Sequence, residues 1–207
     1  LKTAILIVLF VFLSGCNNIF SAIPIPLSYD GVKDYVIGQE ESFSYPIDQV
    51  LESTIHNLHQ MGFAIVRIER FEQKSLIHAT WENTSVNLSM ETIAPKLTKF
   101  TCKVGRGNGS REYSSEKELF CKVRETLKQS QTFDWGELAR GMITVHFSPD
   151  ENSRVIAYLK PGAETELIGE EGEWGKIALM DECAGYIALR HLRIEEDSYL
   201  LKRYDSR

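Results

Sequence analysis

The chain has 207 residues, of which 43% are hydrophobic and 25% are charged, as in an ordinary globular protein. Its formal net charge of −6 argues against a nucleic-acid-binding protein, because such proteins present a basic face to the phosphates. The length is enough for one large domain or two small ones.

The first residues have the pattern of a secretory signal. Lys2 precedes a run of about ten apolar residues, which small residues follow. The run is roughly half of the ~20 residues that a membrane-spanning helix needs, so a plain membrane anchor is the weaker alternative. We therefore interpret residues 1–15 as a signal peptide and residues 16–32, which include Pro24 and Pro26, as an extended linker.

The end of this signal, Leu13-Ser14-Gly15-Cys16, resembles a bacterial lipobox. The resemblance implies cleavage between Gly15 and Cys16, a diacylglycerol on the Cys16 thiol, and acylation of the new amino terminus. Two or more acyl chains hold a protein on a membrane where one chain barely does. Asn17 stands where an Asp retains many lipoproteins on the inner membrane. We therefore expect a lipid-anchored protein of the bacterial envelope, on the outer membrane and facing the periplasm.

Residues 33–130 are predicted to form an α+β domain. An irregular strand within 34–44 is followed by a helix that begins at Pro46, carries one apolar stripe and ends at Gly62. Four runs rich in β-branched and aromatic residues then predict strands at 63–68, 76–81, 86–93 and 97–104. Short turns between consecutive strands favour an antiparallel sheet.

A second helix is expected after the glycine-rich turn at 105–109. Ser115 and Glu118 have the spacing of a capping box, so the helix is predicted to begin at Ser115. Each helix has one apolar face, and both are expected to cover the same face of the sheet. The glycine-rich turn could also cradle a phosphate, but it lacks the Lys-Ser/Thr ending of a P-loop, and a hairpin is the better interpretation.

The span from Tyr35 to Leu127 resembles a family of small bacterial lipoproteins of unknown function. The likeness is carried by Tyr35-x-x-Gly38, Tyr45-Pro46, Leu58-x-x-x-Gly62 and Lys103-Val104-Gly105. It implies the α+β fold and no activity.

After a linker at residues 131–140, residues 141–194 consist of short strands separated by Gly and Pro, which predicts a small all-β barrel. They resemble the bacterial SH3-like (SH3b) domain. The matching segments are Ser148-Pro149, Val155-Ile156-x-x-Leu159-x-x-Gly162, Gly169-Glu170 before Trp174, and Gly185-Tyr186-Ile187 before His191-Leu192. The sequence departs from the family at His146-Phe147, Gly175 and Tyr186. Residues 195–207 are interpreted as a C-terminal tail.

The SH3b resemblance implies a ligand groove lined by aromatic side chains, for which the candidates are Trp174, Tyr186 and Tyr158. The alternative is that these rings only pack the barrel. Residues 141–194 contain nine acidic and five basic side chains, which favours a cationic or neutral partner. A peptidoglycan peptide and an envelope protein are the partners that we expect.

Three cysteines remain once Cys16 carries lipid. Cys102 and Cys121 could form a disulfide, which would close a loop that contributes ~3 kcal/mol to stability. The alternative is that Cys102, Cys121 and Cys183 are buried thiols. Cys183 could also act as a nucleophile, but no base is positioned beside it in the sequence.

Glu52, His56 and His59 are spaced to lie on one face of the first helix, where two imidazoles and a carboxylate could hold a metal ion. The better interpretation is a solvated helix face, so we predict no metal and no other cofactor. The sequence as a whole favours a non-enzymatic envelope lipoprotein that acts as a binding or scaffolding module. A metal-dependent enzyme, or a cell-wall hydrolase that the barrel targets, is the alternative.

Overall fold

The computed structural model describes residues 38–129, 131–180, 183–195 and 198–201. The predicted signal peptide at 1–15, the expected lipid-attachment residue Cys16 and the predicted linker at 16–32 lie outside this range, as does part of the predicted tail. Contacts group Gly38–Arg207 into one compact unit.

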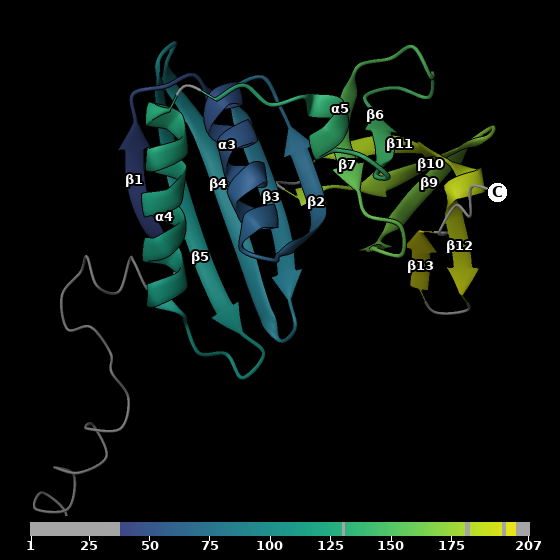
Figure 1. Cartoon of the computed structure of the whole chain (residues 1–207). Helices are drawn as coiled ribbons and strands as arrows, with labels where there is room; N and C mark the ends of the chain where they lie inside the picture. Colours follow the sequence, from purple (N-terminus) through teal and green to yellow (C-terminus); the bar gives the residue numbers. More distant parts are fainter. Residues whose placement is uncertain (1–37, 130, 181–182, 196–197, 202–207) are drawn as a thin grey trace, which may run out of the picture. The chain divides into compact units, whose positions relative to one another are not determined.

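Thirteen strands and three α-helices make up the described part of the chain (Figure 1). The helices are α3 (Ile47–Gln60), α4 (Tyr113–Lys128) and the short α5 (Trp135–Leu138). The first strands are β1 (Gln39–Phe43), β2 (Ala64–Arg70), β3 (Lys74–Trp81), β4 (Thr84–Ala94) and β5 (Leu97–Arg106). The later strands are β6 (Ile143–His146), β7 (Val155–Leu159), β8 (Glu164–Thr165), β9 (Leu167–Glu171), β10 (Trp174–Ala178), β11 (Ala184–Ala188), β12 (Leu192–Glu195) and β13 (Ser198–Leu201).

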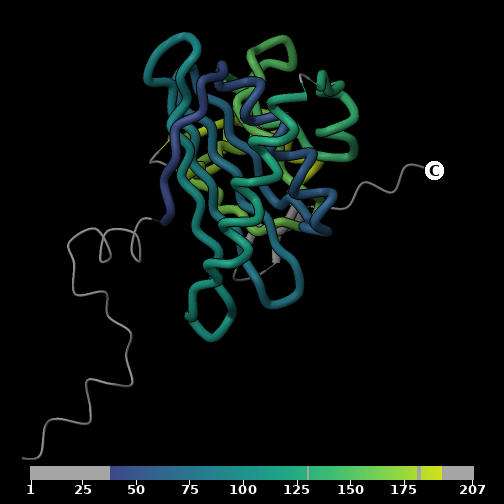
Figure 2. Tube along the Cα trace, turned by 60° about the vertical axis from the view of Figure 1, so that its left-hand side comes forward, coloured from purple at the N-terminus to yellow at the C-terminus, as the bar shows by residue number. Residues whose placement is uncertain are grey.

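Ten of these strands form one antiparallel sheet in the order β1-β5-β4-β3-β2-β7-β6-β11-β10-β9, and β12, β13 and β8 form a second sheet. The predicted α+β class and the four consecutive strands after the first helix are confirmed. The expected separate barrel is not found: β7 pairs with β2, through Ile68 opposite Tyr158, so the later strands continue an open sheet. The chain path through both halves can be followed in Figure 2.

Helices α3 and α4 lie on the same face of β1–β5, as the sequence predicts (Figure 1). The apolar stripe of α3 is fully buried against the sheet, through Val50, Leu51, Ile55 and Leu58. Gly62 follows the helix with a φ of +83°, the left-handed conformation that commonly ends a helix.

The predicted capping box of α4 is wrong. The helix begins at Tyr113, two residues before Ser115, and its N-cap residue Glu112 makes no side-chain cap hydrogen bond. The first turn is held instead by Glu116, whose carboxylate accepts hydrogen bonds from the Arg111 side chain and from the backbone N–H of Val104. These bonds tie the helix start to the loop that precedes it and to β5.

The two halves of the sheet bury opposite faces. Residues directly opposite in an antiparallel pair share a face, and neighbours along a strand alternate. Ile68 packs in the core under the helices, and its partner Tyr158 packs against the same core. The neighbours of Tyr158, Ala157 and Leu159, belong to a second core, together with Val145. The second core therefore lies on the face away from α3 and α4.

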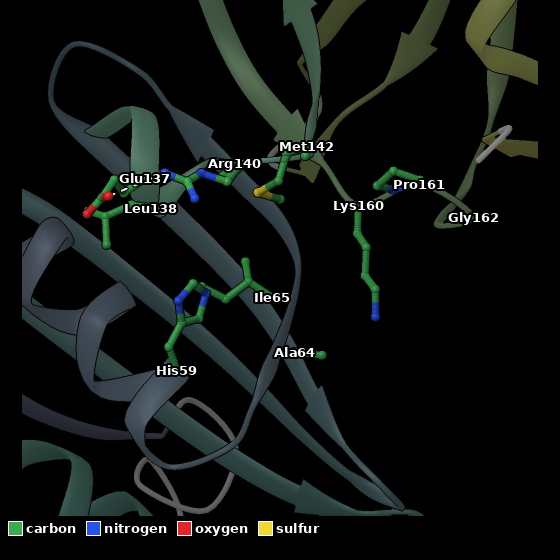
Figure 3. Close-up of a pocket in the computed structure, with 11 residues that line it drawn as sticks. His59, Ala64, Ile65, Glu137, Leu138, Arg140, Met142, Lys160, Pro161 and Gly162 are labelled. Carbon is green, nitrogen blue, oxygen red and sulfur yellow. Dashed lines mark hydrogen bonds and ion pairs between the residues drawn. The ribbon is translucent and has the colours of Figure 1, made fainter. Parts of the chain in front are cut away.

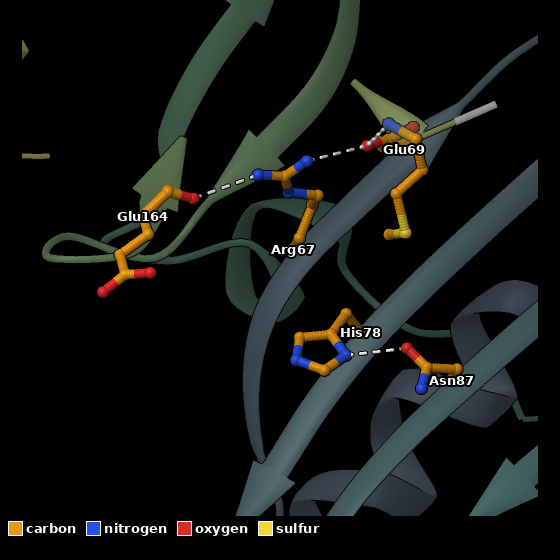
Figure 4. Close-up of polar contacts among 6 residues, drawn as sticks. Arg67, Glu69, His78, Asn87 and Glu164 are labelled. Carbon is orange, nitrogen blue, oxygen red and sulfur yellow. Dashed lines mark hydrogen bonds and ion pairs between the residues drawn. The ribbon is translucent and has the colours of Figure 1, made fainter. Parts of the chain in front are cut away.

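A buried charged pair lies on that second face, on the strand where the halves meet (Figure 4). The Glu69 side chain is fully buried, and its Oε1 lies 3.5 Å from Nη1 of Arg67. The same oxygen accepts a 2.9 Å hydrogen bond from the backbone N–H of Met180, and Arg67 donates to the backbone carbonyl of Glu164 at 3.2 Å. Charged side chains of β2 thus fasten two segments of the second half.

Candidate functional site

The helix face that carries Glu52, His56 and His59 is partly covered. The ring of His56 packs on Phe133, 4.5 Å away between centroids, from the stretch expected to be a linker. Burial raises the pKa of Glu52, with the nearby Asp48 adding to the effect and Arg70 opposing it. Burial, and then His56, lower the pKa of His59. This face is therefore not the simple solvated surface that the sequence favoured.

Across the described residues, no three His, Cys, Asp or Glu side chains come close enough to hold a metal ion. The suggested disulfide is also not formed. Cys102 is buried beneath the helices, whereas Cys121 is exposed on α4, and both are free thiols, as is the exposed Cys183. Cys121 faces away from the core in which Cys102 is packed, so the two sulfur atoms are not brought together.

Trp174 lies at the edge of an open recess of about 460 Å³. Its indole packs edge-on against the ring of His146, with 5.4 Å between centroids. The recess is lined by Pro149, Asp150, Glu151, Asn152, Glu173, Trp174, Ala188 and Arg190. Three acidic side chains thus face one basic side chain, and that base, Arg190, is paired with Glu151 at 3.0 Å. The recess therefore offers an aromatic surface with an excess of negative charge.

Tyr186 lies on the same face of the sheet as Trp174, since Lys176 is opposite Tyr186 and Trp174 is opposite Ala188. Its hydroxyl donates to Glu171 at 3.0 Å, and this hydrogen bond raises the Tyr186 pKa. Lys176 lies over its ring, at 5.9 Å from the centroid. The candidates Trp174 and Tyr186 are therefore brought onto one surface.

Tyr158, the third aromatic candidate, lies elsewhere. Its ring packs against Trp135 of α5, at 5.3 Å between centroids. The guanidinium of Arg70 lies over the Trp135 ring, 4.3 Å from its centroid. Tyr158 belongs to the packing of the helix-side core. It does not line the Trp174 recess.

A larger recess of about 750 Å³, shown in Figure 3, was not indicated by the sequence. It lies between the end of α3, the start of β2, the segment after α5 and the turn after β7. Three basic side chains from separate elements line it, His59, Arg140 and Lys160. Arg140 and Lys160 both precede turns that contain Gly, but a turn alone does not identify a ligand site. The two residues line one recess because β7 pairs with β2.

Within the described ranges, no helix has the length and apolar character needed to cross a bilayer. No protein-family model matches this chain, and no curated protein shows a significant match to it.

Proposed function

We propose that this protein is a non-enzymatic lipoprotein of the bacterial cell envelope that binds an extended peptide, of the cell wall or of an envelope protein, at the Trp174 recess. The observation that carries the proposal is the half-buried aromatic face formed by Trp174 and Tyr186 beside an acidic rim. Rigid aromatic side chains bind extended peptides well, because little side-chain freedom is lost on contact.

In this proposal, residues 141–194 are a variant SH3-like module, although its strands join the larger sheet. The support is that β6, β7, β10 and β11 contribute to a second core, around Val145, Ile156, Ile177 and Ile187, against which Val66 and Phe71 also pack. Gly175, which departs from the SH3b pattern, fits this core: a Cβ atom there would lie 2.8 Å from side-chain carbons of Leu167 and Leu192. A larger residue at position 175 would require the ends of these leucine side chains to move.

The charge of the recess favours a ligand with a basic group. Within the described part of the chain, Asp150 and Glu173 make no ion pair, while Glu151 is paired with Arg190. An ammonium group beside Trp174 would gain from the carboxylates and from the indole face. Membrane attachment at Cys16 would keep this surface near the cell wall.

The test of location uses the full chain, labelled with palmitate in cells and then fractionated. We expect label in the outer-membrane fraction, and none in a Cys16→Ala variant. A soluble, unlabelled product of the unaltered chain would contradict the proposal.

The test of binding measures how much full-length protein is retained on purified sacculi, or co-purifies with an envelope protein after crosslinking. Trp174→Ala is expected to reduce retention more than tenfold, as for an aromatic hot spot. Trp81→Ala is the matched control, since Trp81 is 50% exposed on β3 and away from the recess. Equal loss in both variants, or no retained partner at all, would contradict peptide binding at Trp174.

A further inference from the structure

The larger recess, formed around His59, Arg140 and Lys160, has the features of a second binding site. Its apolar wall includes Ile65 and Leu138, which are 6% and 8% exposed, and Met142. Its volume of about 750 Å³ falls within the ~300–1,000 Å³ of small-molecule sites. In Figure 3, the polar ends of His59 and Lys160 border the same hollow.

The backbone that carries the two cations is fixed by hydrogen bonds. The Lys160 N–H donates to the carbonyl of Val66 at 2.8 Å, and the Lys160 carbonyl accepts from the N–H of Ala163 at 3.0 Å. The Arg140 N–H donates to the carbonyl of Glu137 at 3.2 Å. Gly141 and Gly162, which follow these cations, adopt φ values of +76° and +84°. The recess is therefore bordered by defined turns.

The charges that face the recess leave a surplus of one positive charge. Arg140 is paired with Glu137 at 3.3 Å, while Lys160 makes no ion pair within the described ranges. Burial, and then His56, lower the pKa of His59, which favours the neutral imidazole, so His59 is counted as a hydrogen-bonding group and not as a charge. One net charge suits a monoanion better than a phosphate dianion.

We propose that this recess binds a monocarboxylate with an apolar body, the carboxylate at Lys160 and the body against Ile65, Leu138 and Met142. A peptide C-terminus and a short fatty acid share this chemistry. The site is separate from the Trp174 recess, so this proposal does not depend on the proposed function.

The experiment titrates the full chain with two probes, octanoate and N-acetyl-Ala-Ala, by calorimetry and by amide shifts in NMR. The neutral controls are octanol and the C-terminal amide of the same dipeptide. We expect at least one carboxylate to bind more than tenfold more tightly than its neutral control, with shifts at Ile65, Gly141 and Gly162. Binding by octanoate alone identifies a fatty acid, and binding by the dipeptide alone identifies a peptide C-terminus.

Lys160→Glu is expected to weaken binding more than tenfold, because it replaces the surplus positive charge with a negative one. Lys117→Glu, on the exposed surface of α4, is the matched control and should change affinity less than twofold. Thermal melting of both variants checks that they are folded. Lack of binding by both carboxylates, equal affinity for the neutral controls, or an equal effect of the two charge reversals would overturn the proposal.

Discussion

The guanidinium of Arg111 donates two hydrogen bonds to the carboxylate of Glu116, one to each oxygen and each 2.7 Å long. The two side chains are 3% and 0% exposed, so this pair is buried between β5 and the first turn of α4. Arg111 also lies over the ring of Tyr113, 4.4 Å from its centroid. The pair thus links the loop, the helix and the sheet at one point.

Removing the charge of Glu116 leaves the Arg111 guanidinium buried without an opposite charge beside it. Glu116→Gln is expected to lower the free energy of unfolding by ~3–5 kcal/mol, measured by urea denaturation. Glu118→Gln is the control, because Glu118 pairs with Lys122 at the surface, and its effect should stay within ~0.5 kcal/mol. Similar small effects of both substitutions would contradict a structural role of the buried pair.

Gly185 is required for packing in the second core. A Cβ atom at this position would lie 2.5 Å from Cγ1 of Val145 and 3.1 Å from Cδ1 of Ile156. Gly185→Ala is therefore expected to destabilise the protein by ~1–3 kcal/mol in chemical denaturation. In Gly169→Ala, the nearest neighbour of the new carbon is Cβ of Lys176 at 3.9 Å, so stability should be almost unchanged. If Gly185→Ala were equally neutral, the close packing at β11 would be wrong.

Glu69 fixes the backbone of Met180, which donates its N–H to the buried carboxylate. Glu69→Leu removes this acceptor and leaves the Met180 N–H without a partner, which costs ~1–3 kcal/mol. Hydrogen exchange at the Met180 amide should therefore be faster by about 10–100-fold. Glu69→Gln keeps an acceptor oxygen and should give a smaller change. Glu164→Gln leaves the contact of Arg67 unaltered, because that contact is to the backbone carbonyl. Unchanged protection in Glu69→Leu would count against the contact.

The thiols should differ in reactivity. Burial raises the pKa of Cys102 well above its usual range, with Glu116 adding to the effect and Arg111 opposing it. Because the thiolate is the reactive form, iodoacetamide should modify Cys121 and Cys183 in the folded protein and spare Cys102. Mass spectrometry of the digested protein measures the modification, and unfolding in urea is the control that exposes all three. A disulfide-linked peptide containing Cys102 and Cys121 would contradict this prediction.

The raised pKa of Glu52 gives stability a defined pH dependence. Burial disfavours the ionised carboxylate in the folded state, so the folded protein binds more protons than the unfolded one between the two pKa values. Stability from this group is therefore lost as the pH rises through the folded-state pKa. Glu52→Gln should raise the melting temperature at pH 7, and the gain should disappear at pH 3.5, where the acid is protonated in both states.

The control for this measurement is Glu125→Gln, on the exposed surface of α4. It should leave the melting temperature nearly unchanged at both pH values. A lower melting temperature of Glu52→Gln at pH 7 would show that the carboxylate stabilises the fold.

Local patterns were sufficient to predict α3 and the strands β2–β5, and α3, β4 and β5 each bury one set of residues at a regular spacing. The apolar repeat of Val50, Leu51, Ile55 and Leu58 places one face of α3 in the core whatever it packs against. The pairing of Ile68 with Tyr158 joins residues ninety positions apart in the chain, and no local pattern specifies a partner at that distance.

The candidate site was predicted only in part, for the same reason. Trp174 and Tyr186 lie on neighbouring strands, and the pairing of Lys176 with Tyr186 places them on one face. The recess at Lys160 needs the turn after β7 to lie beside the start of β2, and this follows from the long-range pairing. Tyr158 lies in the helix-side core, because that strand directs this residue toward the helices.

The sheet changes the face that it buries where β2 pairs with β7, and this has a consequence for the ancestry of the chain. Genetic recombination that transferred residues 141–194 to another protein would separate β7 from its hydrogen-bonded neighbour and from Arg67 and Glu69. The remaining half would then expose Val66 and Phe71, which pack against the second core. The two halves are therefore expected to descend as one heritable unit, so that relatives carry both or neither.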